Sequence, residues 1–218
     1  MATITISRLL GSNGEIIAHK VAQELSYKII TKQTLEEILK EYGLVQLDSF
    51  YQSPPRLWSR LDQDTRHLVL MLNKVMLGIA KRGETVILGR GGYAALRNLS
   101  GSVHVRVQAP LPVRVRRIVE REQSDDIRLV EKLIKENDKA RALFVNGFYD
   151  TNFDRAEQFH LVIDTNLIPV DTAVEWIVVA AKMAESSKAS GSYLAKDIDE
   201  DQMLAEVIDK VLMSTSMD

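Results

Sequence analysis

The sequence predicts an α/β protein in which a five-stranded parallel sheet is covered by helices on both faces. Short runs rich in β-branched residues alternate along the chain with amphipathic helical patterns. The run Thr85–Leu88 is short and strongly apolar, as in a parallel strand that is buried on both faces. The first run, Thr3–Ser7, leads through a glycine-containing loop into a helical pattern. Right-handed crossovers between such strands produce a three-layer αβα domain.

Each element is justified by its own local pattern. The expected strands are short and rich in β-branched or aromatic residues: Thr3–Ser7, Tyr27–Ile30, Thr85–Leu88, Val103–Val107 and His160–Ile163. The expected helices repeat apolar residues every three or four positions: about 15–25, 35–42, 65–82, 113–122, 127–145 and 170–184. Thr31 or Thr34 is expected to cap the second helix, and Gly43 to end it.

Composition excludes several classes of protein. A chain of 218 residues suits one α/β domain with a small lid, and a net charge of −2 argues against a general nucleic-acid binder. There is no cysteine, and the four histidines show no metal-ligand spacing, so we expect no protein-bound metal site. No apolar run reaches transmembrane length, and the first residues lack a signal-peptide pattern. We therefore expect a cytoplasmic protein that makes no membrane contact.

The loop between the first strand and the first helix predicts an anion site. Gly11, Asn13 and Gly14 are residue types that tolerate positive φ. A strand, a glycine loop and a helix point backbone N–H groups and a helix N-terminus at an anion, for which a nucleotide phosphate is the obvious candidate. In the full phosphate-loop pattern a lysine and a hydroxyl follow, but here those positions hold Gly14 and Glu15. An ordinary turn without a ligand is the alternative.

Four motifs together resemble the cytidylate kinase-like family, a branch of the P-loop nucleoside monophosphate kinases. They are Ile6-Ser7-Arg8, Gly11-Ser12-x-Gly14, Gly89-Arg90-Gly91 and Asp138-Lys139-Ala140-Arg141. The family commonly has a Gly-Ser-Gly-Gly loop without the lysine, so Gly14 is typical of it, whereas Asn13, Glu15 and Ile16 depart from its pattern. The resemblance implies a P-loop kinase domain over residues 1–185, with a helical lid at about 122–153. It also implies ATP and Mg²⁺ as cofactors and a nucleotide and a small-molecule acceptor as partners.

The resemblance also assigns roles to individual residues. It implies that nucleotide phosphates lie over Arg8, Gly11, Ser12, Asn13, Gly14 and Glu15. It implies that the acceptor phosphate meets Arg90, with Lys32 as a second acceptor-binding residue. It also implies that Arg117 at the lid hinge and Asp138 and Arg141 of the lid act in catalysis. Arg8 is the residue within the loop that can replace the lysine. The irregular stretch after Leu44 corresponds to the acceptor-binding segment of these kinases.

Each role has a plainer alternative. Arg90 could anchor its loop, and Lys32 could be a solvated helix-start residue. Asp138 and Arg141 could form a helix-surface salt bridge, worth only tenths of a kcal/mol. For the whole protein, the function expected from the resemblance is transfer of phosphate from ATP to a small acceptor such as a nucleoside monophosphate. The alternative is a non-catalytic nucleotide-binding or regulatory module that kept the kinase fold.

The C-terminal part, residues 186–218, is expected to be a linker followed by an amphipathic helix. Small residues dominate positions 186–192, and an apolar stripe follows from about Asp199 to Met213. The stripe contains Leu204, Val207, Ile208 and Val211. We expect it to pack either on its own domain or on a second copy, which would make a homodimer.

Overall fold

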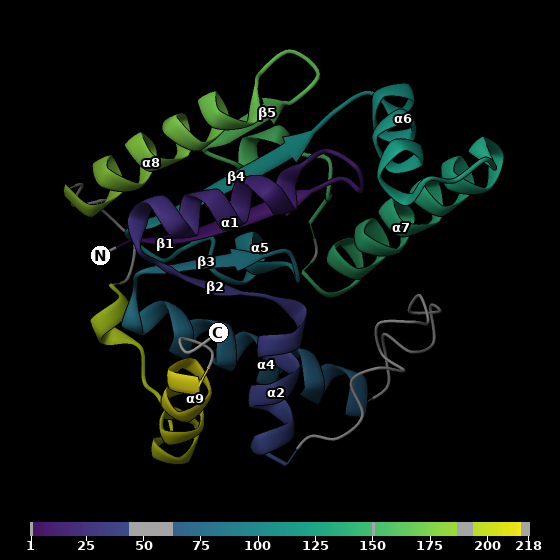
Figure 1. Ribbon diagram of the computed structural model, residues 1–218. Helices are drawn as coiled ribbons and strands as arrows, with labels where there is room; N and C mark the ends of the chain where they lie inside the picture. Colours follow the sequence, from purple (N-terminus) through teal and green to yellow (C-terminus); the bar gives the residue numbers. More distant parts are fainter. Residues whose placement is uncertain (1, 44–62, 150, 187–193, 215–218) are drawn as a thin grey trace.

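The protein has one parallel sheet, with its strands in the order β2-β3-β1-β4-β5 (Figure 1). The computed structural model describes residues 2–43, 63–149, 151–186 and 194–214. The strands are β1 (Thr3–Arg8), β2 (Lys28–Ile30), β3 (Thr85–Leu88), β4 (Ser102–Gln108) and β5 (Leu161–Asp164). Every pairing is parallel. The predicted five-stranded parallel sheet is therefore confirmed, and so is the central place of its first strand.

Helices cover both faces of the sheet, which makes the predicted three layers (Figure 1). They are α1 (Gly14–Leu25), α2 (Lys32–Glu41), α4 (Gln63–Arg82), α5 (Gly92–Ala95), α6 (Leu111–Glu122), α7 (Ile127–Phe148), α8 (Val170–Ser186) and α9 (Gln202–Ser214). On one face, Ile4 and Ile6 of β1 pack with α1 and α8. On the other face, Ile30 and Ile87 pack with α2, α4 and α9.

Helices α6 and α7 stand apart from these layers, beyond the carboxyl ends of the strands (Figure 1). They pack on each other through Val115, Ile118, Val130 and Ile134, which form a small core of their own. Ligands of open parallel sheets bind at this edge. Helices α6 and α7 therefore lie beside the loops that leave the sheet at this edge, and the expected lid at about 122–153 stays a prediction.

Helices α2, α4 and α6 begin two or three residues earlier than the sequence pattern predicted. Helix α2 begins at Lys32 because Thr31 caps it, with the Thr31 side chain accepting a hydrogen bond from the N–H of Thr34. Helix α6 begins at Leu111, although two prolines suggested a later start. Pro112 lies in the first turn, where a missing N–H costs no intrahelical hydrogen bond.

The C-terminal helix α9 packs on its own domain, against α2 and α4. Leu204, Ile208 and Val211 are at most 2% exposed, and Val207 is partly buried. Arg82 of α4 forms ion pairs with carboxylates of the C-terminal segment at 2.6 Å. The expected linker falls mostly at positions 187–193, outside the described residues, and so does the expected acceptor segment from 44 to 62. In the ranges that the structure describes, no helix combines the length and apolar character needed to cross a membrane.

Candidate functional site

The loop between β1 and α1 presents backbone N–H groups that the protein itself does not use. Asn13 precedes α1 with a φ of 61° and makes no side-chain cap, so the first turn of the helix stays open. Within the described residues, five N–H groups of this loop and first turn donate to no acceptor: those of Gly11, Asn13, Gly14, Glu15 and Ile16. Such groups at a helix N-terminus are suited to binding an anion.

Ser12 has a different role from the predicted one. It is fully buried, and its hydroxyl donates to the backbone oxygens of Leu9 (2.8 Å) and Val107 (3.1 Å). Its N–H also bonds to the oxygen of Leu9, at 3.2 Å. Because both donors are engaged inside the protein, Ser12 holds the loop in shape and does not offer a group to phosphate.

The Arg8 side chain extends from this loop to the loop that follows β3. A Cβ added to Gly14 would lie 2.5 Å from the Cβ of Arg8, and one added to Gly89 would collide with its Nη1 atom. Both glycines therefore leave room for Arg8. The side chain starts beside Gly14, the residue at the position of the missing lysine, and its guanidinium ends at the second loop.

The second loop, Gly89-Arg90-Gly91, is strained. All three residues have positive φ, of 79°, 54° and 71°. A left-handed conformation costs a residue with a side chain roughly 1–2 kcal/mol, and such strain gathers at functional sites. Arg90 also lies close enough to Arg8 and Arg141 for its charge to lower the pKa of both. The loop after β3 therefore adds a third arginine to the region.

The electrostatics of this region favour an anion. Burial lowers the pKa of Arg8 to about 9, with further lowering by the charges of Arg141 and Arg90, while Glu15 acts in the opposite direction. Burial also lowers the pKa of Arg141, which Asp138 raises and Arg90 lowers. Arg8 remains charged at pH 7. Two partly buried arginines with a third beside them thus carry positive charge that a bound phosphate would neutralise.

A cavity of about 80 Å³ lies over the first loop, lined by residues 8–16 with Arg117, Ile118, Arg121 and Arg141. Sites for small-molecule ligands usually measure about 300–1,000 Å³. Arg141 of α7 lies across the cavity, because its Nη1 donates to the backbone oxygen of Arg8 at 2.7 Å. Helix α7 therefore lies directly against the loop, and the cavity is smaller than a usual small-molecule site.

The remaining predicted site residues are engaged with the protein. Arg117 lines the cavity, but its two terminal nitrogens donate to the hydroxyl (2.9 Å) and backbone oxygen (2.7 Å) of Thr165. Lys32 forms an ion pair with Glu36 one helical turn later, at 3.1 Å. This is the contact expected of a helix-start lysine, the alternative given above.

Asp138 forms its ion pair with Arg114, at 2.6 Å, instead of with Arg141 three residues later in α7. Sequence reasoning did not single out Arg114. The available signal was the spacing of Arg114, Arg117 and Arg121 on one face of α6. That spacing could not tell which of the three is buried, and it is Arg114, at 7% exposure.

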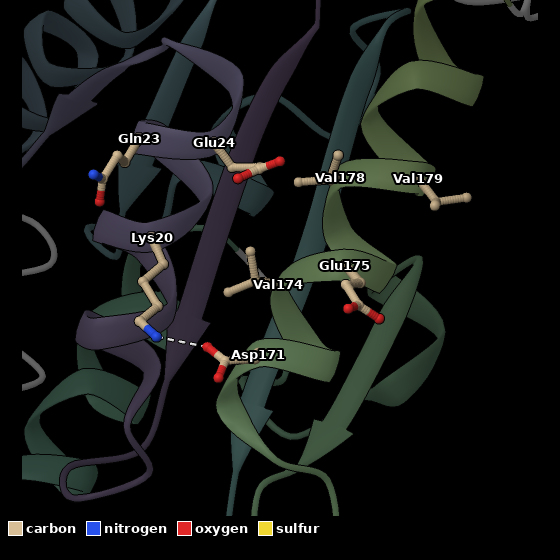
Figure 2. A pocket seen from close by; sticks show the side chains of 8 residues that line it. All are labelled: Lys20, Gln23, Glu24, Asp171, Val174, Glu175, Val178 and Val179. Atoms are coloured by element: carbon tan, nitrogen blue, oxygen red, sulfur yellow. Dashed lines mark hydrogen bonds and ion pairs between the residues drawn. The ribbon is translucent and has the colours of Figure 1, made fainter.

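A larger hollow, of about 550 Å³, lies away from the loop between α1 and α8 (Figure 2). Figure 2 shows Lys20 paired with Asp171 at 2.5 Å, and the carboxylates of Glu24 and Glu175 beside a row of valines. Three carboxylates and one lysine would repel a phosphate. The chemistry of the hollow therefore does not suit a nucleotide, and the loop remains the candidate site.

Comparison with known proteins agrees with this geometry. Residues 3–167 match the model of the cytidylate kinase-like family. The chain belongs to this family. A cytidylate kinase of Methanospirillum hungatei JF-1 is 25% identical over 171 residues, covering 77% of this chain and 89% of the relative. For a cytidylate kinase of Methanococcoides burtonii the identity is 26% over 194 residues, with 87% and 99% covered.

Solved structures confirm the predicted P-loop kinase fold for this member of the cytidylate kinase-like family. An uncharacterised protein from Eubacterium ventriosum superposes with a TM-score of 0.68 at 20% identity, covering 85% of this chain and 99% of that one. A gluconokinase from Sinorhizobium meliloti 1021 gives 0.52 at 15% identity, with 85% and 94% covered. The family match ends at residue 167, so helices α8 and α9 lie outside it.

Proposed function

We propose that this protein is a phosphotransferase that moves a phosphoryl group from ATP·Mg²⁺ to a small acceptor, such as a nucleoside monophosphate. The observation that carries the proposal is the course of Arg8. Its side chain passes from Gly14 at the first loop to Gly89 at the second, the loop that carries Arg90. A cation between a donor loop and an acceptor loop lies where charge on a transferring phosphoryl group would need neutralising.

The donor phosphates would lie on the five open N–H groups of the first loop, at the N-terminus of α1. Arg8 would take the place of the absent lysine, and Arg141 would turn from the backbone oxygen of Arg8 to the transferring group. When bound, Mg²⁺ neutralises charge on the phosphates. Glu15 lines the cavity and is the carboxylate of the loop that could ligate the ion, since Mg²⁺ binds through one or two carboxylates together with phosphates.

Arg90 would bind the acceptor phosphate. It leaves the carboxyl end of β3, the edge at which parallel sheets bind ligands. The relatives from M. hungatei and M. burtonii are cytidylate kinases, which makes CMP the first acceptor to test. Lys32 would contribute only if it left Glu36.

A non-catalytic binding module remains the competing function. In a non-catalytic module we expect the arginines of the site to pair with neighbouring carboxylates. In the described part of the chain, Arg8, Arg117 and Arg141 form no ion pair with any carboxylate. This supports the enzyme, because no carboxylate ion pair in the described residues neutralises the charges of these three arginines.

Calorimetry with ATP, with and without Mg²⁺, and an assay of ATP consumption across the nucleoside monophosphates test the proposal. Arg8→Ala should weaken ATP binding about 10- to 100-fold, the loss of one charged hydrogen bond. Arg90→Ala should raise the KM for the acceptor and leave the Kd for ATP in place, and Arg97→Ala, an exposed arginine, serves as control. If the protein binds ATP·Mg²⁺ but consumes no ATP with any of the nucleoside monophosphates, it is the non-catalytic binding module instead.

A further inference from the structure

One residue of the first loop, Leu10, is held through both of its backbone polar groups. Its N–H donates to Oδ1 of Asp138 at 3.0 Å. Its carbonyl oxygen accepts a hydrogen bond from Nη1 of Arg114, also at 3.0 Å. The same Nη1 lies 2.6 Å from Oδ2 of Asp138. The ion pair and the peptide groups of Leu10 therefore form one closed network.

This network is anchored on three elements. Arg114 comes from α6, Asp138 from α7, and Nε of Arg114 donates to the oxygen of Ala109, just after β4, at 2.9 Å. The loop also packs directly on α6. A Cβ added to Gly11, which has a φ of +80°, would lie 2.9 Å from the backbone oxygen of Arg114. The loop can therefore shift only if Arg114 shifts with it.

The position of Leu10 decides where the open N–H groups point. Gly11 follows it directly, and the N–H groups of Gly11 and Asn13 are among those without an acceptor in the described part of the chain. In a loop with the usual lysine, that residue meets the phosphates. Here Gly14 stands in its place. Without that lysine, phosphate binding depends more on the N–H groups of the loop, and therefore on their orientation.

We propose that Arg114 and Asp138 are positioning residues, which set the geometry of the phosphate loop by holding Leu10. The inference rests on the proposed function in one respect, which is that the ligand of the loop is a nucleotide phosphate. Asp138 then acts through the loop and not on the reacting atoms, and Arg114 joins the site as a residue that the sequence did not reveal.

A second arginine–aspartate ion pair, formed by a buried arginine and an exposed aspartate, provides a control. Arg106 is 4% exposed and pairs with Asp154 at 3.0 Å, and it also donates to the backbone oxygen of Phe153 at 2.8 Å. Like Arg114, Arg106 is a buried arginine that donates both to a carboxylate and to a backbone oxygen. No hydrogen bond of this pair in the described residues reaches the first loop. Loss of the Asp154 carboxylate therefore removes an ion pair and leaves both hydrogen bonds of Leu10 in place.

The test compares Asp138→Ala, Asp138→Asn and the control Asp154→Ala in the full chain. Two quantities are measured: hydrogen exchange at the Leu10 amide by NMR, and the Kd for inorganic tripolyphosphate by calorimetry. In Asp138→Ala we expect at least about tenfold faster exchange and about 10- to 100-fold weaker binding. Asp138→Asn should recover part of both, because its amide oxygen can still accept the N–H of Leu10. The control should lower the melting temperature and leave both quantities unchanged.

Unchanged exchange at Leu10 in either Asp138 variant, or an equal change in the control, would overturn the positioning role. So would tripolyphosphate binding as tight as in the wild type. If Asp138→Ala does not fold, Asp138→Asn decides, with exchange faster than wild type expected. A wild-type protein that binds no tripolyphosphate would refute the proposed function, and exchange at Leu10 would still decide whether the pair holds the loop.

Discussion

Replacing Arg8 by methionine should stabilise the protein without ligand and weaken its binding of ATP. Burial lowers the pKa of Arg8 far below the ordinary value of a guanidinium group, to about 9, so the fold disfavours the charged form at every pH below 9. At about 1.4 kcal/mol per pKa unit, the whole shift corresponds to roughly 5 kcal/mol. Solvent reaches part of the side chain, and guanidinium groups rarely lose their proton, so the net gain should be about 1–2 kcal/mol.

Thermal unfolding measures this gain. For a chain of this size, about 1–2 kcal/mol raises the Tm by roughly 3–6 °C. Arg97→Met, which also exchanges a cation for a thioether but at an exposed position, should leave the Tm close to that of the wild type. In saturating ATP·Mg²⁺ the Tm of the wild type should rise by more than that of the variant, because a ligand at about 100 times its Kd adds about 2.7 kcal/mol to the wild type and less to a variant that binds weakly.

Two results would refute this reasoning. A lower Tm for Arg8→Met without ligand would show that the guanidinium stabilises the fold. An equal rise in Tm with ATP·Mg²⁺ in the variant and the wild type would show that Arg8 does not meet the nucleotide. Either result would remove the observation on which the proposed function depends.

Two further predictions concern stability. Burial and the charge of His160 lower the pKa of His104 to about 3. The His104 ring therefore stays neutral in the folded protein down to that pH, whereas in the unfolded chain it gains a proton below about pH 6.5. Between those pH values this group should lower the free energy of unfolding by about 1.4 kcal/mol for each pH unit of acidification. Urea unfolding at several pH values should show a weaker dependence of that free energy on pH in His104→Gln. An unchanged pH dependence would contradict the assignment. Ile208→Ala, at a fully buried position of α9, should cost about 2–5 kcal/mol in urea unfolding, whereas Met213→Ala, 70% exposed, should cost little. A dimer that dissociates with unchanged monomer stability would instead place α9 at an interface.

The sequence by itself determined the fold class, the central strand and the position of the loop. Alternating β-branched runs and helical patterns are local, and each reports which face of an element is buried. The strand Thr85–Leu88 was predicted with its observed ends, because it is short and strongly apolar and Gly83 and Gly89 lie just outside it. The apolar face of α9 was likewise predicted from the sequence. The sequence did not indicate whether that face packs on its own domain or on a second copy.

Only the tertiary structure decided which polar groups meet. The pattern of α6 showed three arginines on one face, but burial of Arg114 depends on how α6 packs on the loop and on α7. Asp138 was expected to act with Arg141, three residues away, and it pairs with Arg114, 24 residues away in sequence. The course of Arg8 toward Gly89 follows from the parallel pairing of β1 with β3, which brings their carboxyl ends together. Long charged side chains reach partners from other elements, and a one-dimensional pattern records the spacing along an element but not the neighbour that faces it.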